Sequence, residues 1–332
     1  MSDPSHVAVI RPTVDVHLTP SDLRAAMEAD VRVGLTAEHK HLPPVYFYDD
    51  RGSRLFDEIT RLPEYYPTRA ERSILEAHGK DMAQQSRADT LVELGAGTCD
   101  KSRILLEALQ ATGSLKAFVP LDVSETTLWN SALELAEEFP GLAITTVVAD
   151  FRRHLEHLPT GGTRLFVFLG GTIGNLDPAQ RRRFLMDLDC AMDPSDHFLL
   201  GTDLVKDRRR LVAAYDDAAG VTAEFNRNVL HVLNRELGAD FVPERFEHVA
   251  LWNEDESRIE MRLRASVAQQ VRVADLDLDV TFEAGEEMLT EISCKFTPEA
   301  LEEELVASGF VVESMWESEG SEFLMTLAAP YC

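Results

Sequence analysis

Short apolar runs alternate with longer amphipathic stretches through the middle of the chain, between residues 90 and 202. The apolar runs predict buried strands at 90–94, 115–121, 144–149, 164–169 and 197–202. Between them, apolar residues recur every three or four positions, which predicts helices at 101–111, 125–138 and 178–192. Alternation at this spacing favours right-handed βαβ crossovers and therefore an α/β fold with a parallel sheet.

The chain before this block predicts helices after an irregular start. Residues 1–18 show no clear period, so we expect a loosely held arm. Ser21 is a candidate cap for a helix whose apolar stripe begins at Leu23. Further helices are predicted at 53–59 and 69–85.

The pattern changes after residue 206. Residues 207–218 and 222–237 are predicted helices, and 246–283 alternate like antiparallel strands without the spacing of βαβ units. A last helix begins with Thr297 as its cap, and a hairpin of two apolar strands closes the chain. We therefore treat the segment after 206 as an insertion that joins the N-terminal helices. The expected domains are 70–206 with 292–332, and 19–65 with 207–291.

Composition excludes several classes of function. The chain has 332 residues and a formal net charge of -26, so its surface repels phosphate backbones and anionic membranes. We therefore expect no nucleic-acid and no membrane partner.

The four cysteines lie far apart without a C-x-x-C pair, which favours reduced thiols over a zinc site or a disulfide framework. The N-terminus lacks a signal-peptide pattern and no run reaches membrane-spanning length, so we expect a cytoplasmic protein without a metal. The oligomeric state stays open, a monomer included.

The first predicted strand ends in two glycines, Gly95 and Gly97, and a helix start follows. Glycine allows backbone N–H groups to approach a ligand closely, and a helix start favours polar or anionic groups. A plain strand-to-helix turn is the alternative, because Gly-x-Gly by itself is common. The pattern at the other strand ends decides between the two.

Polar or glycine residues follow the next three strands as well. Asp122 ends the second, where a carboxylate can accept two hydrogen bonds from ribose hydroxyls. Asp150 and Phe151 end the third and can bond an adenine amino group and cover the base, while a glycine-rich stretch follows the fourth. Because ligands of open parallel sheets bind at the carboxyl ends of the strands, these residues predict a nucleoside-containing ligand.

Two cofactors contain such a nucleoside. A dinucleotide would need a third glycine three positions after Gly97, where this chain has Asp100, whose carboxylate would face a pyrophosphate. S-adenosylmethionine has no phosphate and needs close glycines, an acid for the ribose and an acid–aromatic pair for the adenine. The sequence therefore favours S-adenosylmethionine.

With these features and the inserted segment, the chain resembles the L-histidine Nα-methyltransferase family of ergothioneine biosynthesis, from about Leu23 to the last strand. The most specific stretches are 47–49, 62–69, 168–170, 172–176, 201–207, 214–217, 225–228 and 285–296. The resemblance implies a Rossmann-like class I methyltransferase sheet, mostly parallel with an antiparallel last strand, and a second α+β substrate domain formed by insertion. It also implies Nα-trimethylation of L-histidine to hercynine, the first step of ergothioneine biosynthesis. One departure is Cys99, where a third glycine often sits in methyltransferases.

The resemblance further implies residue roles. The residues that would hold S-adenosylmethionine are Gly95, Lys101, Asp122, Asp150 and Phe151, with Lys101 at the methionine carboxylate. The residues that would hold L-histidine are Tyr65, Asn175, Tyr215, Glu291 and Ser293, with Asn175 and Tyr215 at its carboxylate. Glu291 and Ser293 would contact the imidazole, and because they are two apart on a strand they face the same side. No catalytic residue is implied beyond substrate positioning.

Three other functions stay open. The nearest is the same chemistry on another amino acid such as tryptophan, but a carboxylate with a hydroxyl favours imidazole because the two can pair with both ring nitrogens. A non-catalytic S-adenosylmethionine-binding regulator would not need both polar strand ends and a complete second domain. A nicotinamide oxidoreductase would bind NADH.

Overall fold

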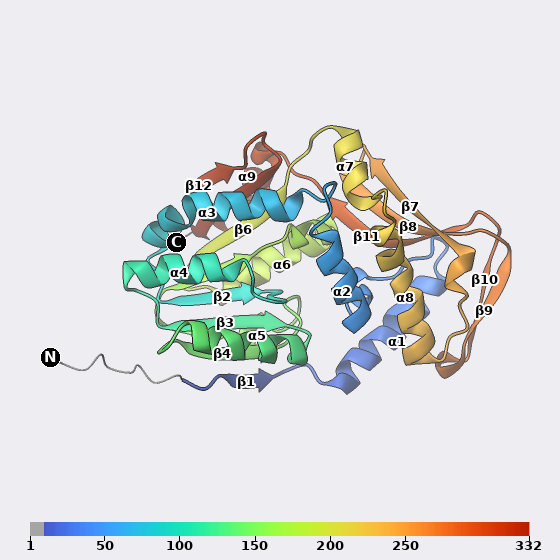
Figure 1. Cartoon of the computed structure of the whole chain (residues 1–332), viewed down its shortest axis with the longest axis horizontal. Helices are drawn as coiled ribbons and strands as arrows, with labels where there is room; N and C mark the ends of the chain where they lie inside the picture. Colours follow the sequence, from blue (N-terminus) through green and yellow to red (C-terminus); the bar gives the residue numbers. More distant parts are fainter. Residues whose placement is uncertain (1–9, 332) are drawn as a thin grey trace.

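The computed structural model describes residues 10–331, and it shows a twisted sheet with helices on both faces beside a second α+β region (Figure 1). Within these residues the main sheet has eight strands. In spatial order they are β1 (Thr13–Val16), β4 (Ala143–Val148), β3 (Ala117–Asp122), β2 (Thr90–Leu94), β5 (Arg164–Phe168), β6 (His197–Asp203), β13 (Phe323–Pro330) and β12 (Phe310–Glu317). β1 to β6 pair in parallel, whereas β13 is antiparallel to both β6 and β12. The predicted fold class is confirmed.

The strands of this sheet are buried on both faces, which is why they appear in the sequence as nearly continuous apolar runs. In β2, Leu91 faces one core, and Val92 and Leu94 face the other. The helices over the first core are α3 (Pro67–Ser86), α4 (Ser102–Thr112) and α5 (Glu125–Glu138), and those over the second are α6 (Pro178–Ala191) and α9 (Pro298–Ala307).

The second region has an apolar core of its own. Its helices are α1 (Pro20–Thr36), α2 (Asp50–Ile59), α7 (Arg208–Tyr215) and α8 (Val221–Leu237). Its strands are β7 (Phe246–Asn253), β8 (Arg258–Ala265), β9 (Gln269–Val273), β10 (Leu278–Phe282) and β11 (Glu287–Cys294). β11, β8 and β7 form one antiparallel sheet, and β9 pairs with β10. The division of the chain into two domains at the expected boundaries stays a prediction.

Short 3-10 helices connect several of these elements. They are η1 (Pro44–Phe47), η2 (Leu155–His157), η3 (Thr172–Asn175), η4 (Pro243–Arg245) and η5 (Ala274–Leu276). The most relevant to the site is η3, which follows β5 and packs on β11: a Cβ at Gly174 would come within 2.8 Å of the backbone oxygen of Cys294. The main sheet and the second region are therefore in close contact at the carboxyl end of β5.

Two expectations for the N-terminal part are wrong. Within the arm expected to be loose, β1 pairs in parallel with the edge strand β4, and its four side chains are exposed, so no apolar period marks it; residues 1–9 lie outside the described residues. The cap of α1 is Thr19, with Pro20 at the first helical position. The Thr19 hydroxyl accepts from the Asp22 N–H at 3.2 Å and the Asp22 carboxylate accepts from the Thr19 N–H at 3.0 Å, whereas Ser21 lies inside the first turn.

The two regions are joined where β6 and β11 end. The N–H of Phe296 donates to the carbonyl of Asp203 at 3.0 Å, and the N–H of Val205 donates to the carbonyl of Phe296 at 2.8 Å. The carboxyl ends of the parallel strands face the second region (Figure 1). No helix within residues 10–331 is long and apolar enough to cross a membrane.

Candidate active site

The turn after β2 has the backbone geometry that its glycines predict. Gly95 and Gly97 have φ angles of 72° and 50°, in the left-handed region that favours glycine. Cys99 also has a positive φ, 56°, and its side chain is buried. Such a φ is uncommon for a residue with a side chain. The departure from glycine at Cys99 therefore changes the side chain but keeps the turn geometry.

Asp122, at the end of β3, faces this turn. Its carboxylate accepts hydrogen bonds from the backbone N–H groups of Gly97 at 3.1 Å and Ser124 at 3.0 Å. Burial raises the pKa of Asp122 above its ordinary value, although the backbone hydrogen bonds lower it. A desolvated carboxylate with unused lone pairs is suited to accept hydroxyl donors, because each such bond offsets the loss of water.

The acid–aromatic pair after β4 lies beside the same turn. A Cβ at Gly95 would be 3.9 Å from the Phe151 ring, which packs edge-on against Phe168 with ring centroids 4.9 Å apart. Asp150 forms a two-pronged ion pair with Arg152, with Nε at 3.0 Å and an Nη at 2.8 Å. Burial would raise the pKa of Asp150, but Arg152 lowers it below the ordinary value. The carboxylate is thus ionised and already partly satisfied by the chain.

Lys101, at the start of α4, forms an ion pair that the sequence did not predict. Its Nζ pairs with Glu71 of α3, a carboxylate with no exposed surface. The other oxygen of Glu71 accepts from the backbone N–H of Gly170, after β5, at 2.7 Å. Lysine has three donors, so Lys101 keeps N–H groups for a ligand carboxylate. Glu71 thus links the segments after β2 and β5, yet in the sequence it resembles any other helix acid.

On the substrate side, β11 contains a β-bulge. Its pairing with β8 shifts between Leu289 and Glu291, which leaves Thr290 as an extra residue. Met288 is buried before the bulge, and Glu291 and Ser293 are buried after it. Because side chains alternate between faces, one extra residue reverses the faces beyond it. The bulge therefore turns Glu291 and Ser293 inward, on one face as predicted.

A chain of side-chain hydrogen bonds connects the bulge to α7. The hydroxyl of Thr290 donates to Oδ1 of Asn226 at 2.6 Å, and Nδ2 of Asn226 donates to Nδ1 of His248 at 2.8 Å. Nε2 of His248 then donates to the carbonyl of Tyr215 at 2.8 Å. Burial lowers the pKa of His248, in agreement with the neutral ring that this donor pattern requires. The bulge and the backbone of Tyr215 are thus held relative to each other.

The other predicted substrate residues lie around Glu291 and Ser293. Tyr215 donates from its hydroxyl to Ser293 Oγ at 2.8 Å, and its ring centroid is 6.3 Å from that of Tyr65. Asn175 is at the end of η3, which packs on β11, and its side-chain amide has no hydrogen-bond partner among residues 10–331. The structure thus brings together residues from four separate parts of the chain.

Glu291 is a buried carboxylate that has no partner in the part of the chain that the structure describes. Only 9% of its surface is exposed, and among the described residues its side chain has no hydrogen bond or ion pair. Burial raises the pKa of Glu291 to about 7, although Lys295 lowers it. A buried ionisable group normally has a partner. A ligand N–H group is the chemistry that would satisfy this one.

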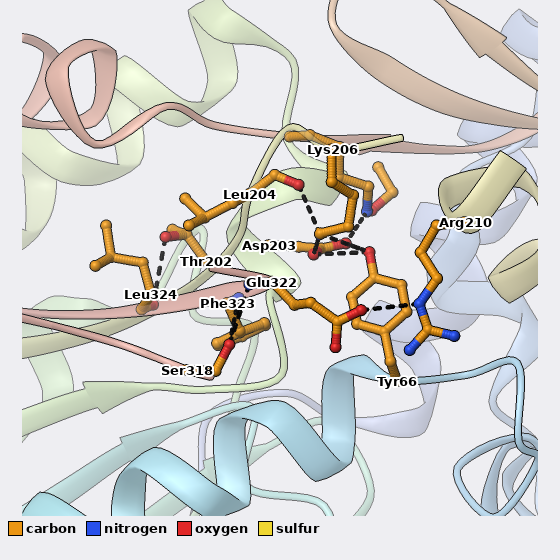
Figure 2. Close-up of polar contacts among 12 residues, drawn as sticks. Tyr66, Thr202, Asp203, Leu204, Lys206, Arg210, Ser318, Glu322, Phe323 and Leu324 are labelled. Atoms are coloured by element: carbon orange, nitrogen blue, oxygen red, sulfur yellow. Dashed lines mark hydrogen bonds and ion pairs between the residues drawn. The ribbon is translucent and has the colours of Figure 1, made fainter. Parts of the chain in front are cut away.

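A polar cluster that the sequence does not predict lies behind the substrate residues. The buried ammonium of Lys295 pairs with Asp203 at 2.8 Å, and Asp203 also accepts from the hydroxyl of Tyr66 at 2.9 Å and from Lys206 (Figure 2). Burial would raise the pKa of Asp203, but Lys295 and Lys206 lower it. All four residues lie in stretches that carry the family resemblance. Apart from that resemblance they carry no local signal, because a lysine or an acid after a strand is usually solvated.

The residues at the strand ends have the chemistry needed to bind S-adenosylmethionine. A glycine turn with positive φ angles, a desolvated carboxylate at Asp122 and an aromatic ring at Phe151 are adjacent to one another. Lys101 adds an ammonium group at the same edge of the sheet. These residues do not form a cluster of free cations that would hold a pyrophosphate, because the cation among them, Lys101, is paired with Glu71.

A sequence model described as "Histidine-specific methyltransferase, SAM-dependent" matches residues 27–330 of this chain. The chain belongs to this family. Its cofactor is S-adenosylmethionine, in agreement with the donor set at the strand ends.

Relatives in the family have related names. The chain is 55% identical over 320 residues to a histidine N-alpha-methyltransferase of Mycobacterium tuberculosis, with 96% of this chain and 100% of that protein covered. It is 28% identical to ergothioneine biosynthesis protein 1 of Schizosaccharomyces pombe, covering 85% of this chain and 38% of that protein. It is also 28% identical to the L-tryptophan methyltransferase of Psilocybe serbica, covering 87% and 88%. A solved S-adenosylmethionine-dependent methyltransferase of Clostridium acetobutylicum is similar at a TM-score of 0.46 and 11% identity, covering 85% of this chain and 98% of that one.

The position of Asp122 generates a test of the cofactor site. Asp122→Asn keeps the shape and one acceptor for the turn but removes the charge, so we expect the affinity for S-adenosylmethionine to fall by about 1–3 kcal/mol. Isothermal calorimetry measures this directly. Asp100→Asn is the matched control, because the Asp100 side chain is 66% exposed on the same turn and should leave the affinity unchanged. Equal affinities for wild type and Asp122→Asn would remove Asp122 from the site.

Proposed function

We propose that this chain transfers methyl groups from S-adenosylmethionine to the α-amino nitrogen of L-histidine, three in succession, to give hercynine, the first step of ergothioneine biosynthesis. The observation that carries the proposal is the buried carboxylate of Glu291, unpaired among residues 10–331, beside Ser293 on the face of β11 next to Tyr215. A carboxylate and a hydroxyl on one face can pair with both nitrogens of an imidazole. The family and the name of the 55% identical relative support the same substrate.

In the proposed complex, Asp122, Asp150, Phe151, Gly95 and Lys101 hold the cofactor, which supplies a methyl group on a cationic sulfur. Asp122 accepts the ribose hydroxyls, and Phe151 covers the adenine. Asp150 would share its carboxylate between Arg152 and the adenine amino group. The ammonium of Lys101 lies at the methionine carboxylate, with Glu71 fixing its direction.

The substrate is held at both ends. Asn175 binds its carboxylate, and Glu291 and Ser293 bind its ring. Tyr215, whose hydroxyl proton is donated to Ser293, holds that serine in place, and Tyr65 closes the site beside it. Alignment of the nitrogen with the methyl group is what an in-line displacement requires, so positioning supplies most of the rate. Each transfer forms an N–CH3 bond, breaks the sulfonium–methyl bond and releases S-adenosylhomocysteine, and the ammonium loses one proton to solvent before each attack. After the third transfer the nitrogen has no lone pair, and the reaction stops at the trimethylated product.

Tyr48 is near enough to Glu291, Tyr215 and Asp122 for their charges to act on its hydroxyl, although 41% of the residue is exposed. Desolvation raises the pKa of the Tyr48 hydroxyl well above its ordinary value, and the charges of Glu291, Tyr215 and Asp122 raise it further. The phenol therefore stays protonated near neutral pH and does not act as an ionised base. As a neutral hydroxyl it can accept one amine N–H and so direct the nitrogen lone pair toward the methyl group.

The test is an assay of the purified protein with S-adenosylmethionine and each of the twenty amino acids, read by mass spectrometry. Histidine should gain three methyl groups, and no other amino acid should be consumed at a comparable rate. Trimethylated tryptophan would favour the tryptophan alternative that the Psilocybe serbica relative suggests. Cofactor binding without any methylated amino acid would favour a regulator.

Glu291→Gln should lower kcat/KM for histidine, raising the corresponding activation free energy by about 1–3 kcal/mol, because it removes a charged acceptor from a buried hydrogen bond. The loss should be in KM, since the imidazole is remote from the reacting nitrogen and is held alike in the ground and transition states. Discrimination against tryptophan and phenylalanine should shrink as well.

The matched control is Glu287→Gln on the same strand. Glu287 precedes the bulge and pairs with Arg262 and Arg264, away from Ser293. Its kinetics should equal those of the wild type. If Glu291→Gln leaves the ratios of kcat/KM among the three amino acids unchanged, imidazole recognition lies elsewhere.

The raised pKa of Glu291 predicts a pH-dependent stability. The folded value of about 7 exceeds the unfolded value of roughly 4.3, so the folded state binds more protons between these pH values. Wild-type stability should therefore fall as pH rises from 4.5 to 7, by up to about 3 kcal/mol, and the Glu291→Gln variant should lack this fall. Urea midpoints from pH 5 to pH 8 measure the difference.

Glu287→Gln again serves as the control. Arg264 and Arg262 hold the pKa of Glu287 below its ordinary value, although burial raises it. Its pH-dependent contribution therefore lies below pH 5, and its offset from wild type should be constant from pH 5 to pH 8. Parallel curves for wild type and Glu291→Gln would show that Glu291 ionises normally in the folded protein.

A further inference from the structure

Lys295 uses all of its donors inside the protein. Its side chain is fully buried. The ammonium group donates to Asp203 Oδ2 at 2.8 Å, to Tyr215 Oη at 2.9 Å and to Ser293 Oγ at 2.7 Å. An ammonium has three N–H groups and no lone pair. No donor of Lys295 is left for a ligand, so it acts only through these three neighbours.

The contacts of Lys295 limit what Ser293 can do. A hydroxyl oxygen has two lone pairs and one proton. Ser293 Oγ accepts from Lys295 at 2.7 Å and from the hydroxyl of Tyr215 at 2.8 Å, which uses both lone pairs. Its own proton is then the remaining hydrogen-bonding group. Toward a ligand, Ser293 is therefore a donor and not an acceptor.

Glu291 has the opposite character. It is two residues before Ser293 on the same face of β11, and within residues 10–331 its carboxylate has no partner. An ionised carboxylate only accepts hydrogen bonds. The face thus offers one acceptor and one donor. A neutral imidazole has one N–H and one lone pair, whereas an imidazolium has two N–H groups, one of which would meet an oxygen without a free lone pair.

Building on the proposed methylation of histidine, we infer that Lys295 is a positioning residue that fixes Ser293 as a hydrogen-bond donor. The pocket thereby selects the neutral imidazole, in the tautomer whose N–H points to Glu291, and excludes the imidazolium. The selection depends on the charge and direction of Lys295, which no ligand atom contacts.

Other ionisable groups face this cluster from several elements. Figure 2 shows Asp203 at the end of β6, Lys206 after it, Tyr66 before α3, and Glu322 with Arg210. The others are Tyr215 on α7, Tyr48 and Tyr65. Burial would lower the pKa of Lys295, but Asp203 and Tyr215 raise it above its ordinary value. Lys295 thus remains a cation throughout the range in which imidazole titrates.

The experiment compares two ligands by calorimetry, in the presence of S-adenosylhomocysteine so that no methyl transfer occurs. One is histidine, whose free ring has a pKa of roughly 6.5. The other is β-(1,2,4-triazol-3-yl)alanine, whose ring stays neutral from pH 5.5 to pH 8. Protonation of Glu291 at low pH weakens both ligands, so it cancels in the ratio of the two dissociation constants.

In the wild type, the ratio of the histidine to the triazole dissociation constant should rise about tenfold between pH 8 and pH 5.5, following the free imidazole. In Lys295→Met, Ser293 regains a lone pair, and the rise should shrink to less than about threefold. Asp203 still has Lys206 and Tyr66 in that variant. The matched control is Lys206→Met, which removes the other cation from Asp203 without contact to Ser293 and should keep the wild-type rise.

A flat ratio in the wild type, or the full rise in Lys295→Met, would overturn the inference. If Lys295→Met does not fold, ring-¹⁵N-labelled histidine bound to the wild type decides by NMR. One N–H resonance and one lone-pair resonance persisting at pH 5.5 support the inference, and two N–H resonances overturn it. If the wild type neither binds nor methylates histidine, the proposed function itself fails.

Discussion

The buried ion pair between Asp203 and Lys295 is the interaction on which the arrangement of the site depends. Asp203 ends β6 of the main sheet, and Lys295 follows β11 of the second region, so one contact joins the two sheets. Backbone hydrogen bonds through Phe296 run beside it. Removing one partner of such a pair typically costs about 3–5 kcal/mol, because the other charge stays buried. Here each carboxylate oxygen and each ammonium proton has a partner, which makes a buried charge tolerable.

The main sheet was predictable because its signals are local. Apolar runs, the glycine turn and the acids after β3 and β4 depend on a few consecutive residues, and parallel pairing brings the strand ends together without further information. β1 was missed because its side chains are exposed on an edge strand, so no apolar pattern marks it. The predicted cap of α1 lies two residues after the observed cap, Thr19, which precedes a proline that suits the first helical position.

The residues of the site could be predicted from the sequence, but their orientations and contacts only in part. Glu291 and Ser293 were placed on one face from their spacing, yet which face they share depends on an extra residue at Thr290 that only pairing with β8 reveals. Lys295 and Glu71 have no sequence signal of their own, since a lysine after a strand and an acid in a helix are usually solvated. Their roles arise from partners about 90 or more residues away, Asp203 and Gly170. Contacts of this range are set by tertiary structure and not by local pattern.

The bulge at Thr290 has a consequence for how this pocket can change. The side chains beyond the bulge owe their direction to the pairing, because the same residues paired with β8 in regular alternation would turn Glu291 and Ser293 outward together and bring Ile292 inward. Loss of Thr290 would have no such effect, since Leu289 and Glu291 already lie opposite consecutive residues of β8 and would simply become neighbours. The polarity of the pocket is therefore a property of strand pairing as much as of the glutamate and the serine. An alignment records the two residues but not the pairing that directs them.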